Sequence, residues 1–169
     1  GPLAIDETTV LRAMAYRDGL APTNVDTNTY VFVDDVIASP EIGTPVSQLM
    51  RDSLTAVPSM SIVTSRTIND TSEVPTSFEL IFPDGTEGFQ ENCGVKRFGG
   101  AFTNFAKKNF RLYFRSQSGA SKLAYPLFEG HERGIAPPVR FAQLNLRSGS
   151  HDMTQRGGYM SNGCTDDTM

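Results

Sequence analysis

Basic residues are interleaved with aromatic ones over positions 108–130. The segment "KNFRLYFRSQSGASKLAYPLFEG" alternates lysine and arginine with phenylalanine, leucine and tyrosine, turns at a glycine, and continues with a second apolar run. Lysine offers a compact positive charge and arginine a planar fork of donors, and both side chains bind phosphate groups. Such a strand is therefore either a phosphate-contacting surface or an ordinary half-buried strand with one face in water.

Alternation along residues 107–115 assigns these side chains to two faces. Phe110, Leu112 and Phe114 share one face with Lys108, and we expect this face to pack the core. The opposite face carries Lys107, Arg111, Tyr113 and Arg115. A solvated strand face is the simple alternative for the second set, since charged side chains are mostly exposed. Because Lys108 lies on the apolar face, we expect its ammonium group to reach a cleft rather than open solvent.

The other residues capable of chemistry are scattered. In "LNLRSGSHD", Arg147 is a candidate phosphate contact, and His151 and Asp152 are candidates for lining a cleft; a strand end followed by a turn is the alternative. The loop "EGHERG" places His131 beside a glutamate in an exposed position. Two isolated histidines and no closely spaced cysteine pair argue against a zinc site. The sequence also lacks a nucleophile elbow of the Ser/His/Asp hydrolases.

Composition sets limits on the class of protein. The chain has 169 residues, of which 38% are hydrophobic and 20% charged, enough to bury a core in one domain or in one domain plus part of another. The net charge of −4 disfavours nucleic acid as a partner, because nucleic-acid-binding domains are usually basic. No apolar run reaches the roughly 20 residues of a membrane-spanning helix.

The two ends and the cysteines raise separate questions. The start, "GPLAIDETTV", has no methionine and no charged region followed by an apolar one, so we expect an internal fragment of a longer protein. Cys93 and Cys164 lie far apart in the sequence. They are compatible with one structural disulfide or with two free thiols.

The elements that must position these residues are mostly strands. Asp18-Gly19 is typical of a hairpin turn before a strand at residues 29–33, and Asp84-Gly85 of a second hairpin turn between strands at 77–82 and 93–98. Pro and Gly in "DDVIASPEIGTP" indicate a linker, and Thr44 followed by Pro45 indicates a helix that ends at Pro58. Further strands are expected at 60–65, 107–115 and 139–147. The predicted class is α+β, predominantly antiparallel β, with one or two helices.

Two motif series resemble known families. The first is "GPLAIDETTVLRAMAYRDGLAPTNVDTNTYVF", which resembles the end of the chitobiase/β-hexosaminidase C-terminal β-sandwich module. The match covers roughly residues 2–33, and is carried by Thr8, Arg12, Ala13, Ala15, Asp18 and Gly19. It implies that residues 1–37 are the last part of a small β-sandwich and that 38–57 form a linker with a short helix.

The second series resembles the N-terminal half of the CotH family, atypical kinases of the spore-coat type. Its motifs are "PSMSIV", "FELIFPDGTEGFQENCGVKRFGG", "AKKNFRLYFRSQSGASKLAYPLF" and "LNLRSGSHD", in the order of the family. The loop "TSRTINDTSEVP" is shorter and more polar than is usual there, and "GGAFTN" lacks a basic residue often found after the paired glycines. The resemblance implies that residues 58–169 are the N-terminal part of a kinase-like domain.

By this resemblance, the protein transfers phosphate from ATP to serine or threonine hydroxyls of a protein substrate. The family's catalytic and metal-binding aspartates, which hold Mg²⁺, would lie beyond Met169, so no catalytic or metal residue is assigned here. Lys108 is the first candidate for contacting the nucleotide phosphates, and the paired glycines would let the backbone approach them. The further candidates are Lys107, Arg97, Arg111, Gly99, Gly100 and Arg147. The resemblance also implies a bacterial protein at the cell surface or outside the cell.

Two other functions remain open. One is a non-catalytic extracellular module, a structural or carbohydrate-binding part of a surface protein whose partner is a cell-surface or matrix component. A lectin-like sugar binder would need exposed aromatic residues on one sheet face, and the sequence has no tryptophan. The apolar runs around Phe110 and Tyr125 are more simply explained as core than as platforms for RNA bases.

Overall fold

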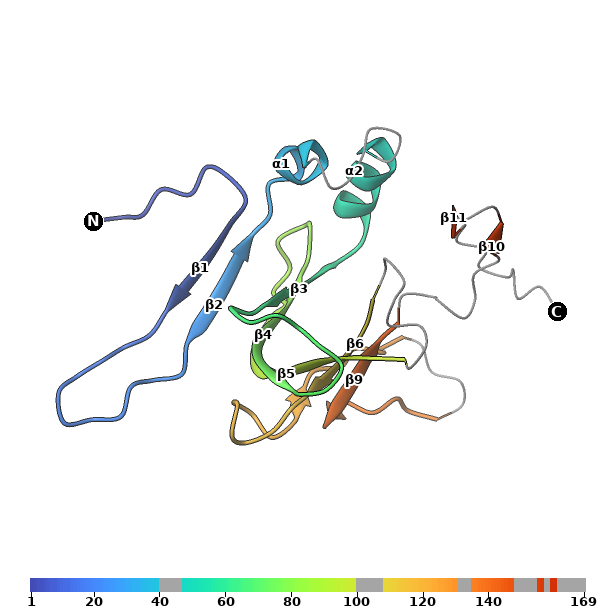
Figure 1. Cartoon of the computed structure of the whole chain (residues 1–169). Coiled ribbons are helices and arrows are strands. Elements are labelled where there is room, and N and C mark those ends of the chain that lie inside the picture. Colours follow the sequence, from blue (N-terminus) through green and yellow to red (C-terminus); the bar gives the residue numbers. More distant parts are fainter. Residues whose placement is uncertain (40–46, 100–107, 131–134, 148–154, 157–158, 161–169) are drawn as a thin grey trace.

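The fold is built around one antiparallel sheet in this computed structural model, which describes residues 1–39, 47–99, 108–130, 135–147, 155–156 and 159–160 (Figure 1). Five strands follow one another in the order β3-β4-β5-β6-β9, and every neighbouring pair is antiparallel. Their bounds are Ser59–Val63, Val74–Ile81, Phe89–Phe98, Asn109–Tyr113 and Gln143–Leu146. The predicted class, α+β with predominantly antiparallel β structure, is confirmed.

The remaining elements surround this sheet. One hairpin pairs β1 (Thr9–Ala13) with β2 (Asp26–Tyr30), and two helices follow it, α1 (Val33–Ala38) and α2 (Ser47–Ala56). Two short pairs complete the described residues: β7 (Leu123–Ala124) with β8 (Arg140–Phe141), and β10 (Gln155–Arg156) with β11 (Tyr159–Met160). Neither helix in these ranges has the length and hydropathy that crossing a membrane requires.

One face of the five-stranded sheet forms the core. Val74, Val95, Leu112 and Leu144 are directly paired across four strands and therefore lie in one row on the same face. The first three are buried, and Leu144 packs against them from the edge strand. Phe114 is also buried, as the alternation along 107–115 predicts. Apolar residues at every second position thus explain both the strands and their register.

The segment after the basic strand closes over this face. The amides of Ser118 and Gly119 both donate to the carbonyl of Arg115, which makes the expected turn. Leu123 is fully buried in the core cluster, and the ring of Tyr125 lies 4.8 Å from that of Phe89. The apolar run around Tyr125 therefore packs against the core, as its sequence predicts.

The hairpin between β4 and β5 turns at Asp84-Gly85, as predicted. Gly85 has a φ of 79°, a left-handed conformation that glycine adopts without steric cost. The side chain of Asp84 accepts a hydrogen bond of 2.9 Å from the backbone amide of Thr86. This bond favours the charged carboxylate and lowers the pKa of Asp84.

The β1–β2 hairpin covers part of the opposite sheet face through polar contacts (Figure 1). The amide of Thr29 donates to Glu79 at 2.9 Å, and its hydroxyl bonds both Glu79 and Ser61. Asn92 donates to the carbonyl of Val25 at 2.8 Å. The hairpin is therefore tied to β3, β4 and β5, and the predicted division of the chain after residue 37 stays a prediction.

The two helices differ from expectation in one respect. A helix over Ser47–Ala56 confirms the predicted one, although its proposed cap, Thr44, lies outside the described residues. The prediction of a linker directly after a strand at 29–33 was wrong, because α1 begins at Val33. Asp34 and Asp35 favour this short helix by placing negative charge in its first turn. Asp34 also pairs with Arg51 of α2.

Candidate phosphate-binding end of the sheet and a second polar cavity

Arg97 lies on the core face of β5, near the strand's end. Cys93 and Val95 are buried on that face, and alternation places Arg97 on it too. The register agrees, because Arg97 pairs with Phe110, which in turn pairs with Leu146. Sequence reasoning ranked Arg97 second to Lys108 and did not anticipate that it shares a face with the core.

The Arg97 side chain has an unsatisfied donor. Its Nε atom is buried and has no hydrogen-bond partner within the described part of the chain, whereas its backbone amide donates to the carbonyl of Asn69 at 2.7 Å. A buried, unpaired donor destabilises the fold more when it belongs to a charged group than when it belongs to a neutral one. An acceptor that binds from outside the protein, such as an oxyanion, would remove this cost.

Gly99 and Lys108 lie at the same end of the sheet as Arg97. Gly99 directly follows β5 and has a φ of 121°, which a side chain would disfavour. Lys108 is half-buried and directly precedes β6, whose first residue, Asn109, pairs with Phe98. The fold therefore brings three of the predicted residues together. Lys107 and Gly100 lie outside the described residues.

Arg111 and Arg147 belong to the other face of this end. The Nε of Arg111 donates to Asn145 at 2.8 Å, and its guanidinium carbon lies 4.8 Å above the ring of Phe98. Arg147 follows Leu146, and alternation turns it away from the core face. The sheet thus separates these two arginines from Arg97, and only Arg97, Gly99 and Lys108 form one candidate site.

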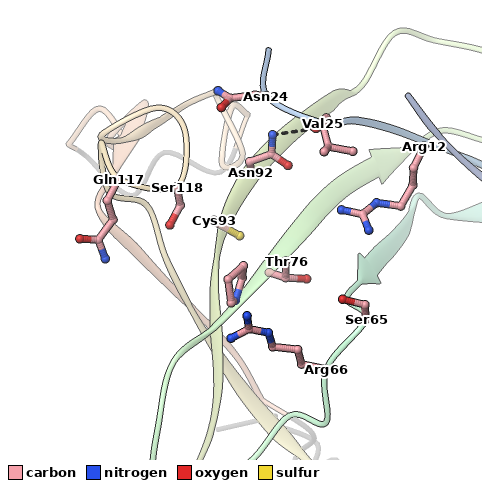
Figure 2. Close-up of a pocket in the computed structure, with 11 residues that line it drawn as sticks. Arg12, Asn24, Val25, Ser65, Arg66, Thr76, Asn92, Cys93, Gln117 and Ser118 are labelled. Carbon is pink, nitrogen blue, oxygen red and sulfur yellow. Dashed lines mark hydrogen bonds between the residues drawn. The ribbon is translucent and has the colours of Figure 1, made fainter. Parts of the chain in front are cut away.

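A cavity of about 310 Å³ opens elsewhere on the sheet, between segments far apart in the sequence (Figure 2). It is lined by Arg12 of β1, Ser65 and Arg66 of the β3–β4 loop, Asn92 of β5 and Ser118 of the turn after β6, among others. Figure 2 shows the guanidinium groups of Arg12 and Arg66 extending from different segments toward the space between them. Sequence reasoning missed this cavity. No pattern joins residues 12, 66, 92 and 118, because they meet only when the hairpin packs on the sheet.

Cys93 forms part of the cavity wall but is not a nucleophile. The thiol is free and fully buried. Burial, with smaller contributions from the charges of Glu73 and Glu91, raises the pKa of Cys93 to about 12. The side chain is therefore a neutral thiol at physiological pH. Its proposed partner in a disulfide, Cys164, lies outside the described residues.

The raised pKa of Cys93 predicts a pH dependence of stability. The unfolded thiol ionises from about pH 9, whereas the folded thiol keeps its proton up to about pH 12. Folding stability is therefore fully present below pH 9 and falls as pH rises toward 12, by up to about 1.4 kcal/mol per pH unit from this group. Urea unfolding at pH 8 and pH 10 should show a steeper loss for the wild type than for Cys93→Ala. Equal losses would contradict the assigned burial.

Within the described part of the chain, no three His, Cys, Asp or Glu side chains gather in a way that could hold a metal ion. Of the other candidates, His131, His151 and Asp152 lie outside the described residues. Comparison with known proteins gave no match, since no family model, no curated protein and no solved structure is significantly similar to the chain.

Proposed function

We propose that residues 58–169 are the N-terminal part of a CotH-like atypical protein kinase domain, and that the end of β5 and β6 contacts the phosphates of ATP. The observation that carries the proposal is the buried Nε of Arg97, for which the described residues supply no hydrogen-bond partner. Gly99, with its φ of 121°, leaves the adjacent backbone unobstructed by a side chain. Lys108 adds positive charge at the same end of the sheet.

Phosphoryl transfer requires little covalent chemistry from the protein. It depends mainly on the positioning of the substrates and on stabilisation of the charge on the phosphates. In this proposal a small shift of the Arg97 side chain exposes Nε, which then donates to a phosphate oxygen, and Lys108 acts as a point charge. In this proposal the residues that hold Mg²⁺ and orient the acceptor hydroxyl belong to another part of the kinase domain. The 169 residues alone should therefore bind ATP weakly and should not hydrolyse it. The full protein would act on serine or threonine of a protein substrate at the bacterial surface or outside the cell.

Replacing Arg97 with glutamine should weaken ATP binding by about tenfold, because a charge-assisted hydrogen bond to phosphate is lost. Glutamine keeps polar atoms on a similar length of side chain and limits disturbance of the fold. Isothermal titration of ATP, with and without Mg²⁺, measures the change. The matched control is Arg140→Gln, since Arg140 is an exposed arginine on β8, away from the candidate site.

Two results would contradict this proposal. The first is an equal change in ATP affinity in Arg97→Gln and Arg140→Gln, because the effect would then reflect only the net charge of the protein. The second is micromolar binding with hydrolysis by the 169 residues alone, which would show that they contain the complete site. A folded chain that binds no ATP would instead favour the non-catalytic surface module.

A further inference from the structure

The cavity between Arg12 and Arg66 concentrates positive charge that the described residues leave uncompensated. Neither guanidinium forms a hydrogen bond or an ion pair within the described part of the chain. Two carboxylates, those of Glu73 and Glu91, act electrostatically on Cys93, which lines the cavity. Glu73 is paired with Arg115 at 3.3 Å, and burial raises the pKa of Glu91. The cavity is therefore suited to an anion rather than to a cation.

The polar groups around the two arginines are also available to a ligand. The side chains of Asn24, Ser65, Gln117 and Ser118 line the cavity and form no hydrogen bond within the described residues. The wall behind them is fixed, because Asn92 donates to Val25 at 2.8 Å and Thr76 donates to Val63 at 2.8 Å. Because the walls are already fixed, less free energy is lost in ordering the site when a ligand binds to the unused polar groups.

The size and lining of the cavity narrow the ligand class. Its volume of about 310 Å³ is at the lower end of the range for small-molecule sites. No lining residue is aromatic, so the cavity has no surface on which a neutral sugar ring could stack. Arginine binds phosphate, sulfate and carboxylate groups in a bidentate manner.

We propose that this cavity binds a small ligand, or the terminal group of a polymer, through an oxyanion held between Arg12 and Arg66. The site is separate from the end of β5 and β6, because none of the residues lining it belongs to the Arg97, Gly99 and Lys108 set. It joins the β1–β2 hairpin to the sheet, so an occupied site also holds the hairpin in place. The proposal does not depend on the kinase assignment.

The test is a titration of the whole chain with three probes: inorganic phosphate, glucose 6-phosphate and glucuronate. Backbone amide chemical shifts should change at Asn92 and Ser118 for at least one probe, with a dissociation constant in the low millimolar range or tighter. Comparing phosphate with glucose 6-phosphate shows whether the site binds a free phosphate ion or a phosphate group attached to a sugar. Glucuronate shows whether the site accepts a carboxylate instead. Affinity should fall as salt is added, because exposed arginines are screened.

Arg12→Gln and Arg66→Gln should each lower the affinity for the tightest-binding probe by about tenfold, as expected for the loss of one charge-assisted contact. The matched control is Arg17→Gln, an exposed arginine in the same hairpin that does not line the cavity, and it should change affinity less than twofold. Arg97→Gln should leave this binding unchanged, which separates this site from the proposed ATP site. The inference is overturned if no probe shifts Asn92 or Ser118, or if both cavity variants bind as the wild type does.

Discussion

Replacing Leu112 with alanine is expected to destabilise the fold by about 3 kcal/mol. Leu112 is 0% exposed and lies on β6, between β5 and β9. It is directly paired with Val95 on one side and Leu144 on the other. Truncating a fully buried leucine loses its transfer free energy and leaves a cavity that a rigid sheet cannot close, which costs 2–5 kcal/mol in typical cores.

Urea denaturation followed by circular dichroism measures this loss as a lower midpoint with an unchanged slope. The matched control is Leu49→Ala, because Leu49 is 67% exposed on α2 and alanine is a good helix former. The control should change stability by less than about 0.5 kcal/mol. If Leu112→Ala were as mild as Leu49→Ala, the row across the sheet would not be the core.

Replacing Glu79 with alanine should release the β1–β2 hairpin from the sheet. Glu79 is only 5% exposed and accepts hydrogen bonds from both the amide and the hydroxyl of Thr29. Its removal leaves the half-buried amide of Thr29 without this acceptor. Hydrogen bonds to charged groups contribute more to folding stability than hydrogen bonds between neutral groups. We expect a loss of about 3 kcal/mol, carried mainly by undocking of the hairpin.

Amide hydrogen exchange distinguishes this local effect from global destabilisation. The Thr29 amide should exchange much faster in Glu79→Ala than in the wild type, while the Leu112 amide keeps more of its protection. Glu87→Ala is the matched control, since Glu87 is an exposed glutamate in the β4–β5 loop. Unchanged protection of Thr29 would show that the hairpin is held by other contacts. It would also support treating residues 1–37 as a separate unit.

Local chemistry predicted most of the strands. Alternating apolar residues at Phe110, Leu112 and Phe114 identified the buried face of β6, and Asp84-Gly85 identified the turn before β5. The helix α1 could not be predicted, because six residues are too few to show a helical period. The proline that follows it is also typical of a linker. Leu49 shows the converse limit. Its helical spacing with Met50 and Leu54 predicts a buried side chain, yet Leu49 is 67% exposed in the described structure.

The candidate sites divide in the same way. Alternation was sufficient to put Arg111 on the face opposite the core, and its pairing with Lys96 and Asn145 agrees. The assignment of Lys108 to the core face rests on the same alternation, because Lys108 directly precedes β6. The burial of Arg97 needed the register between β5 and β6, which pairs it with Phe110. The cavity of Arg12 and Arg66 needed the docking of a distant hairpin, and no local pattern encodes such a contact.

The central claim is that the end of β5 and β6 receives the phosphates of ATP. The most direct measurement is a map of backbone amide chemical shifts during titration of the chain with ATP. The account predicts the largest changes at Phe98, Gly99 and Asn109, and their loss in Arg97→Gln. Changes confined to Asn92 and Ser118, or none in a folded chain, would contradict the claim.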